Sequence, residues 1–188
     1  MDSRPSTPCS FELLTNSQLP PLPALDIGTP LSDVVASAAD HHLQWLCSNL
    51  SDFHPAHLAR ILLLPDRESK VVRRFTDDVV PPGWPEYEHQ FSTEVVISYD
   101  QILLDDAGVD ATVRAWLYNR GIRFGRRVFL LMDSGPRQHV FQMSWRMIVR
   151  YWRVFARHCG FASFVVDDTR TWALCFHHER FMLFGTRS

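Results

Sequence analysis

Three short apolar segments follow one another near the end of the chain, with very short polar stretches between them. The segments read FASFVVDD (161–168), TWALCF (171–176) and RFMLFG (180–185). Apolar segments of this length, bounded by turn residues, predict β-strands. Parallel neighbours need a connection of about a dozen residues or more, so these strands are predicted to form antiparallel hairpins.

The preceding residues extend this pattern and add two helices. Strands are expected at 93–99, 126–133 and 138–143, helical turns within 100–121, and a helix at 144–160. Asp110 is the candidate N-cap of the first of these helices, and Gly121 is its candidate stop. The resulting order, β-α-β-β-α-β-β-β, contains hairpins rather than a steady alternation of strands and helices. It predicts the α+β class: a mainly antiparallel sheet covered by helices, with a helical N-terminal part.

In the N-terminal part, one serine and two prolines indicate where the expected helices begin and end. Ser32 is the candidate N-cap of a helix that begins near residue 31. Pro55 lies in the first turn of a second expected helix, 54–64, and Pro65 ends it. Residues 66–75 predict a third, short helix.

Composition divides the chain into four stretches. The expected units are an irregular or partly disordered Pro-rich segment (1–30), a helical N-terminal part (31–75), a Pro-rich acidic loop (76–93) and an α+β core (94–188). A chain of 188 residues that is 46% hydrophobic has enough apolar material for a real core. We therefore expect residues 31–188 to form one compact unit.

The net charge of −2 hides a strong asymmetry between the two parts of the chain. Residues 1–110 contain six Lys or Arg against 17 Asp or Glu, whereas residues 111–188 contain 13 Arg against four Asp or Glu. Such a split provides a basic surface for an acidic partner, or it lets the two halves attract each other within one fold. The near-neutral total favours attraction between the halves.

Cysteine usage and the absence of targeting patterns indicate a compartment. Cys9, Cys47, Cys159 and Cys175 are scattered without a CxxC pair. The chain starts with polar residues rather than a signal peptide, and no apolar run approaches the roughly 18 residues that span a membrane. We expect a cytoplasmic protein with reduced cysteines and no membrane partner.

Four arginines occupy one side of the strongest expected helix. Arg146, Arg150, Arg153 and Arg157 are spaced by four, three and four residues, so at 100° per residue they lie within about 60° of one another. They form either a binding site for an acidic protein face or a phosphate backbone, or the solvated edge of a core helix that is paired with the acidic half. Nucleic acid fits less well than protein, because the aromatic residues fall on the opposite, apolar face.

The stretch WALCFHHERFMLFG raises the question of a metal or acid–base site. Asp167, Asp168, His177 and Glu179 would be its members if the ends of the neighbouring strands met in space. No HExxH motif and no CxxC accompany them, so the simpler interpretation is that HHER forms the turn of a hairpin. The sequence therefore predicts no metal and no cofactor, with these four residues as the alternative.

Two further pairs are weaker candidates. His54 and His57 lie three residues apart and could meet on one helix face, although a place at the start of a helix is the simpler interpretation. Trp84 and Tyr87 lie in the Pro-rich acidic loop, where exposed aromatic side chains would serve as anchors for a protein partner.

The second half of the chain resembles a known kind of protein. The patterns WRMIVRYWRVF, VVDD and WALCFHHERFMLFG, with WLYNRGIRFGRRVFL upstream, resemble small bacterial domains of unknown function that are similar to the immunity proteins accompanying toxins. The resemblance covers roughly residues 94–186. It implies no catalytic residues to carry over to this chain.

The sequence therefore leads to one main functional hypothesis and two alternatives. The main hypothesis is a non-enzymatic protein-interaction module, most concretely a bacterial immunity-type inhibitor that binds a cognate toxin through Arg146, Arg150, Arg153 and Arg157. The alternatives are a small metal-dependent hydrolase or nuclease that uses the Asp/His/Glu cluster, and a nucleic-acid-binding module. An enzyme is the less favoured class, because the familiar catalytic motifs are missing.

Overall fold

The computed structural model describes residue 22 and the ranges 28–37, 52–85, 91–99, 106–133 and 138–187. Several expectations therefore lie outside the described residues: those for most of the segment 1–30, for the first helix beyond residue 37, for Tyr87, and for Cys9 and Cys47.

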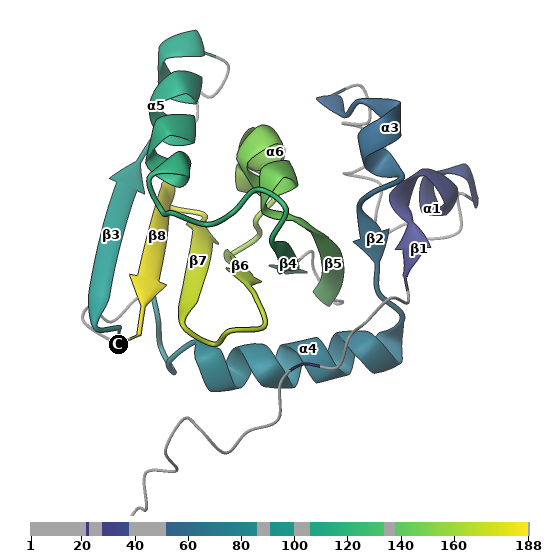
Figure 1. Cartoon of the computed structure of the whole chain (residues 1–188), viewed down its shortest axis with the longest axis horizontal. Helices are drawn as coiled ribbons and strands as arrows, with labels where there is room; N and C mark the ends of the chain where they lie inside the picture. Colours follow the sequence, from purple (N-terminus) through teal and green to yellow (C-terminus); the bar gives the residue numbers. More distant parts are fainter. Residues whose placement is uncertain are drawn as a thin grey trace, which may run out of the picture.

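An antiparallel sheet of eight strands forms the centre of the described structure, and it confirms the α+β class (Figure 1). The strand order is β1-β2-β5-β4-β6-β7-β8-β3, and every neighbouring pair is antiparallel. The strands are β1 Thr29–Pro30, β2 Leu62–Leu63, β3 Thr93–Ser98, β4 Arg127–Asp133, β5 Gln138–Ser144, β6 Ala162–Val166, β7 Trp172–His177 and β8 Phe181–Thr186.

Helices lie on both faces of this sheet (Figure 1). They are α1 Leu31–Ser37, α3 Pro55–Leu58, α4 Asp66–Val79, α5 Ala107–Tyr118 and α6 Trp145–Arg157. From β3 onward the elements follow the expected order β-α-β-β-α-β-β-β. The expectation from the hairpin pattern is therefore confirmed for this part of the chain.

Alternate residues of the strands supply two separate cores. In β4, Val128, Leu130 and Met132 belong to the core beneath α6, whereas Phe129 and Leu131 belong to the core beneath α4. In β7, Trp172, Leu174 and Phe176 belong to the core beneath α6, whereas Ala173 and Cys175 belong to the core beneath α4. Successive side chains of a strand point to opposite faces, so a sheet covered on both faces needs apolar residues at every position.

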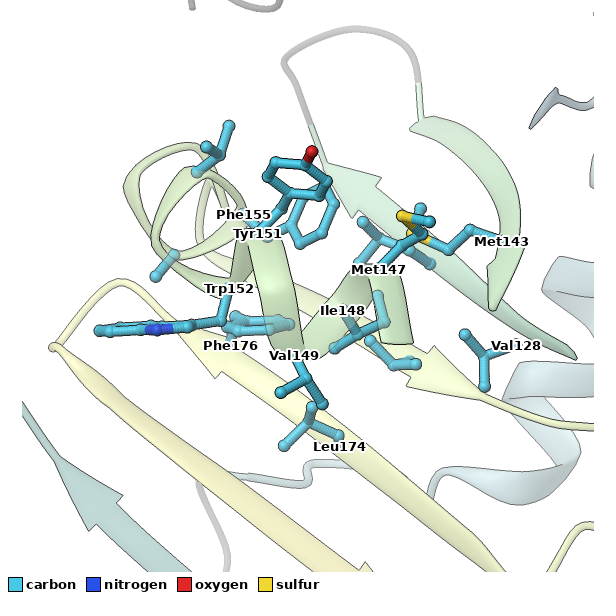
Figure 2. Close-up of a cluster of buried hydrophobic side chains, with 14 of the residues drawn as sticks. Val128, Met143, Met147, Ile148, Val149, Tyr151, Trp152, Phe155, Leu174 and Phe176 are labelled. Carbon is cyan, nitrogen blue, oxygen red and sulfur yellow. The ribbon is translucent and has the colours of Figure 1, made fainter. Parts of the chain in front are cut away.

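Helix α6 packs its apolar side directly on the strands. Figure 2 shows Ile148, Val149 and Trp152 directed toward Leu174 and Phe176 of β7. Each side chain of this kind contributes about 1.5–3 kcal/mol when it is fully buried. This packing fixes which side of α6 remains available to solvent.

The second expected helix was wrong over its last residues. Helix α3 ends at Leu58, and Leu62–Leu63 form β2, which pairs with Phe141 and Gln142 of β5. A short apolar run such as ILLL fits a buried helix and a buried strand equally well by periodicity. Hydrogen bonding to the edge of β5 favours the strand at these residues.

Helix α4 confirms the third expected helix and extends it. It begins after Pro65 and continues to Val79, so the first four residues of the expected loop 76–93 are helical. Val72, Phe75 and Val79 are buried against the sheet at spacings of three and four.

Two expected N-caps were wrong. Ser32 lies inside α1, which begins at Leu31. The N-cap of α5 is Asp106, whose Oδ1 accepts hydrogen bonds from the backbone N–H groups of Gly108 (2.8 Å) and Val109 (3.1 Å). Asp110 lies in the first turn instead, which leaves its carboxylate available to neighbouring helices. Gly121 adopts a positive φ of 73° three residues after α5 ends, as a stop residue requires.

Candidate functional site

The side of α6 that does not pack on the sheet carries the four expected arginines. Arg146 and Arg150 are exposed, and Arg153 and Arg157 are half-buried. This arrangement follows from the helical period, because the buried residues of α6 occupy the rest of its circumference. No carboxylate of the described residues lies within ion-pair distance of Arg146 or Arg150.

A fifth arginine joins this group from the neighbouring helix. Arg114 of α5 donates from its guanidinium group to the backbone carbonyl of Arg150 (3.1 Å). That carbonyl precedes Tyr151, whose φ of −111° and ψ of 19° interrupt the regular helix. No pattern in the sequence points to Arg114, because its place beside α6 depends on how the two helices pack. We call Arg114, Arg146, Arg150, Arg153 and Arg157 the basic face.

Asp110 holds two of these arginines in place. Its Oδ2 accepts from Nε of Arg114 (2.8 Å), and its Oδ1 lies 3.5 Å from Nε of Arg153. The indole N–H of Trp152 also donates to Oδ1 (2.9 Å). Partial burial by itself would raise the pKa of the Asp110 carboxyl, but the hydrogen bonds from Arg114 and Trp152 and the charge of Arg153 lower it. The carboxylate is therefore ionised at neutral pH.

A cleft of about 280 Å³ opens within the basic face. It is lined by Asp52, Arg114, Arg150, Tyr151, Arg153, Val154 and Arg157. Oδ2 of Asp52 lies 3.6 Å from a terminal guanidinium nitrogen of Arg157. Asp52 and Asp110 both belong to the acidic first part of the chain. Ion pairs between the two halves of the chain therefore neutralise part of the positive charge of the arginines.

His54, His57 and Tyr151 form a cluster beside this cleft. His54 is the N-cap of α3, and its backbone N–H donates to the Tyr151 hydroxyl (3.1 Å). Nδ1 of His57 lies 2.6 Å from the same hydroxyl oxygen, and the two imidazole rings are 5.3 Å apart. In Figure 2 this hydroxyl points away from the sheet. Both parts of the expectation hold: the two histidines lie at a helix start, and they meet.

The charge of the basic face acts on these histidines. Burial and the positive charge of Arg150 lower the pKa of His57, with smaller contributions from other basic neighbours, Arg146 among them. The imidazole of His57 is therefore mainly neutral at pH 7. The arginines, whose charge is permanent, determine the potential of this surface.

The four residues of the alternative metal or acid–base site are not brought together. In the pairing of β6 with β7, Val166 lies opposite Ala173 and Ala162 lies opposite His177. Asp167 and Asp168 therefore follow one end of this strand pair, and His177 and Glu179 lie at the other. Among the described residues no group of three or more His, Cys, Asp or Glu is placed to hold a metal ion.

Each half of that expected cluster has a structural role. Asp167 is buried and accepts from Nε of Arg126 (2.8 Å), and Asp168 also pairs with Arg126. At the other end, the backbone N–H of Arg180 donates to the carbonyl of His177 (3.1 Å), and Arg180 has a positive φ of 69°. The stretch HHER is therefore the turn between β7 and β8, which answers the question that its histidines raised.

The prediction that Trp84 is an exposed anchor was wrong. Its side chain is only 4% exposed, and its indole N–H donates to Oε1 of Glu94 (3.1 Å). The ring packs against Phe91 and Phe164 beneath the sheet. Aromatic residues in a Pro-rich stretch look exposed in a sequence, but here the Trp84 side chain packs into the core.

Comparison with protein-family models, with curated proteins and with solved structures found no match to this chain. The resemblance of residues 94–186 to immunity-type domains stays a prediction. Within the described part of the chain, no helix has both the length and the apolar character needed to cross a membrane.

Proposed function

We propose that this protein is a non-enzymatic interaction module that binds an acidic protein surface through its basic face. One observation carries the proposal: five arginines from α5 and α6 converge on one surface, and Arg146 and Arg150 have no ion pair with a described carboxylate. Permanent positive charge on a rigid element attracts an acidic partner at long range and orients it on arrival.

In its most specific form, the module is a bacterial immunity-type inhibitor that covers the active surface of a cognate toxin in the cytoplasm. The resemblance of residues 94–186 supports this form. The rigidity of α6 supports it as well, because a helix fixed on a sheet by Trp152 and Phe155 binds without first becoming ordered.

Nucleic acid is the second candidate for the same face. The arginines would contact phosphates, but the aromatic side chains of α6 are buried and provide no platform for stacked bases. The metal-dependent hydrolase has no comparable support, because its expected residues lie at opposite ends of β6 and β7.

The experiment compares two double variants of the full chain. Tagged protein is incubated with native lysate, and bound proteins and nucleic acids are identified after washing at low and at high salt. Arg146→Glu with Arg150→Glu reverses two exposed charges of the basic face, and we expect it to lose the acidic protein partner. Arg67→Glu with Arg74→Glu on α4 makes the same charge change on the opposite side of the sheet and should keep it.

Two results would contradict the proposal. One is equal partner recovery by the basic-face variant and the α4 variant, which would place the interface elsewhere. The other is recovery of nucleic acid alone, with binding that falls steeply as salt rises, which would favour the second candidate.

A further inference from the structure

The cleft in the basic face has the composition of an anion site. Four of its seven lining residues are arginines, and they come from two helices. A volume of about 280 Å³ lies below the roughly 300 Å³ at which sites for drug-sized ligands begin, so the cleft suits a small group rather than a large one. A guanidinium group presents planar, directional donors, and these match the oxygens of carboxylates and phosphates.

The balance of charges around the cleft indicates which class of anion it would bind. Asp110 pairs with Arg114 and Arg153, and Asp52 pairs with Arg157, while Arg150 has no ion pair with a described residue. Among these side chains the positive charges therefore exceed the negative charges, and Arg150 is the clearest source of the excess. A phosphate monoester carries a charge of about −1.5 to −2 at pH 7 and has three acceptor oxygens, whereas a carboxylate carries one charge and two oxygens.

The donors of the cleft are already in place. Arg114 is held at Nε by Asp110 (2.8 Å) and at a terminal nitrogen by the carbonyl of Arg150 (3.1 Å). A guanidinium group has five N–H donors, so these two bonds leave the other three for a ligand. Tyr151, on the wall of the cleft, is held at its hydroxyl by His54 and His57. Groups fixed before binding lose little entropy when the ligand arrives.

We propose that this cleft binds a dianionic phosphoryl group, that of a phosphate monoester or of inorganic phosphate. The inference rests on the proposed function in that it names a ligand class for the same basic face. A phosphorylated side chain on the acidic partner would place its phosphoryl group in the cleft, while Arg146, the arginine of the basic face outside the cleft, contacts the surface around it. A free phosphate compound would occupy the same donors.

The test is calorimetric titration of the full chain at pH 7.5 and constant ionic strength in chloride. The probes are inorganic phosphate, phenyl phosphate and dimethyl phosphate, the last being a diester with a single charge. We expect the two dianions to bind and the diester to bind at least about tenfold more weakly, because charge-assisted hydrogen bonds are lost with the second charge.

Two matched variants locate the site. Arg150→Gln removes an exposed lining arginine, and we expect about a tenfold loss of phenyl phosphate affinity. Arg146→Gln removes an exposed arginine of the same stripe that does not line the cleft, and we expect a change below about twofold because exposed charges are screened. Equal melting temperatures would show that both variants are folded.

Three results would overturn the inference: no binding of either dianion, equal binding of the diester, or equal losses in the two variants. The last would indicate diffuse attraction to the stripe rather than a site. A fourth titration, with a short acidic phosphoserine peptide, separates the two sources. Binding at least about tenfold tighter than inorganic phosphate supports the site with a protein ligand, and equal binding supports it with a free phosphate compound.

This design also separates the inference from the proposed function. Phosphate binding without recovery of any protein partner would support the cleft as a site for a free phosphate compound and would contradict the proposed interaction module. If the Arg146→Glu, Arg150→Glu variant loses a protein partner and the unchanged protein binds neither dianion, the interaction module would be supported and the phosphoryl site contradicted.

Discussion

The carboxylate of Asp110 connects the two helices that carry the basic face. It accepts from Arg114 on its own helix and from Trp152 on α6, and it lies near Arg153. Its spacing before the apolar residues of α5 is typical of an N-cap, but Asp106 already fills that position. A single carboxylate thus keeps several donors in register, and its charge contributes to stability only while it is ionised.

Replacing Asp110 by asparagine tests this role through pH. Its pKa in the folded protein lies below the ordinary value of 3.8, so the contribution is present above that value and is lost as pH falls through the lower folded pKa. We expect Asp110→Asn to lower the unfolding free energy by about 1 kcal/mol at pH 7, a modest value because the side chain is partly solvated. The difference from the unchanged protein should shrink below pH ~4.

Urea unfolding at pH 7 and at pH 3 measures this difference. Asp77→Asn is the control, since Asp77 is exposed on α4 and has no ion pair with a described residue. We expect it to change stability by less than ~0.5 kcal/mol. A pH-independent loss in Asp110→Asn would show that the carboxylate acts through shape rather than charge.

Among the elements, the edge strand β3 depends on a close approach between its preceding residues and β8. Phe91 lies over Gly185, and the same segment is tied down because the backbone N–H of Phe91 donates to Oε1 of Glu94 (3.0 Å). A Cβ atom added at Gly185 would lie 2.3 Å from the Phe91 ring. Glycine at this position allows the ring to cover the strand.

Replacing Gly185 by alanine should therefore destabilise the fold. The Phe91 ring would have to leave its position on β8, and overpacking of this kind costs about 1–3 kcal/mol. Chemical denaturation measures the loss. Gly125→Ala is the matched control, because no atom lies within 4 Å of a Cβ added there. Equal stability of the two variants would contradict the packing of Phe91 on β8.

At the scale of the whole molecule, two buried cores share one sheet. Cys175 faces the core beneath α4, and Cys159 belongs to the core beneath α6. Burial raises the pKa of the Cys159 thiol to about 11, and it also raises the pKa of the Cys175 thiol well above its ordinary value. The thiolate is the reactive form, so both side chains report whether the molecule has opened.

Alkylation of these thiols should follow global unfolding. In native protein at pH 8, we expect iodoacetamide to label Cys175 only at the rate at which the whole domain opens, and urea should raise that rate together with unfolding. Mass spectrometry of the two peptides measures each site separately. Rapid labelling of Cys175 in the absence of urea would show that the sheet opens locally at β7.

The sequence was sufficient for the elements whose signals are local. The strands β3 to β8, the helix α6 and the turn at HHER were predicted, because a period of two or 3.6 residues and a polar break are visible in a short window. The arginine stripe was predicted for the same reason, since four residues on one helix share a side whatever the helix packs against.

Long-range packing decided what a local pattern leaves open. Leu62 and Leu63 form a strand because they pair with the edge of β5, and Trp84 is buried because it packs against Phe91 and Phe164. The register of β6 with β7 separated Asp167 from His177. Arg114 reached the stripe only because α5 lies beside α6. The sequence determined which side of α6 is basic, and the tertiary structure turned that side into a cleft.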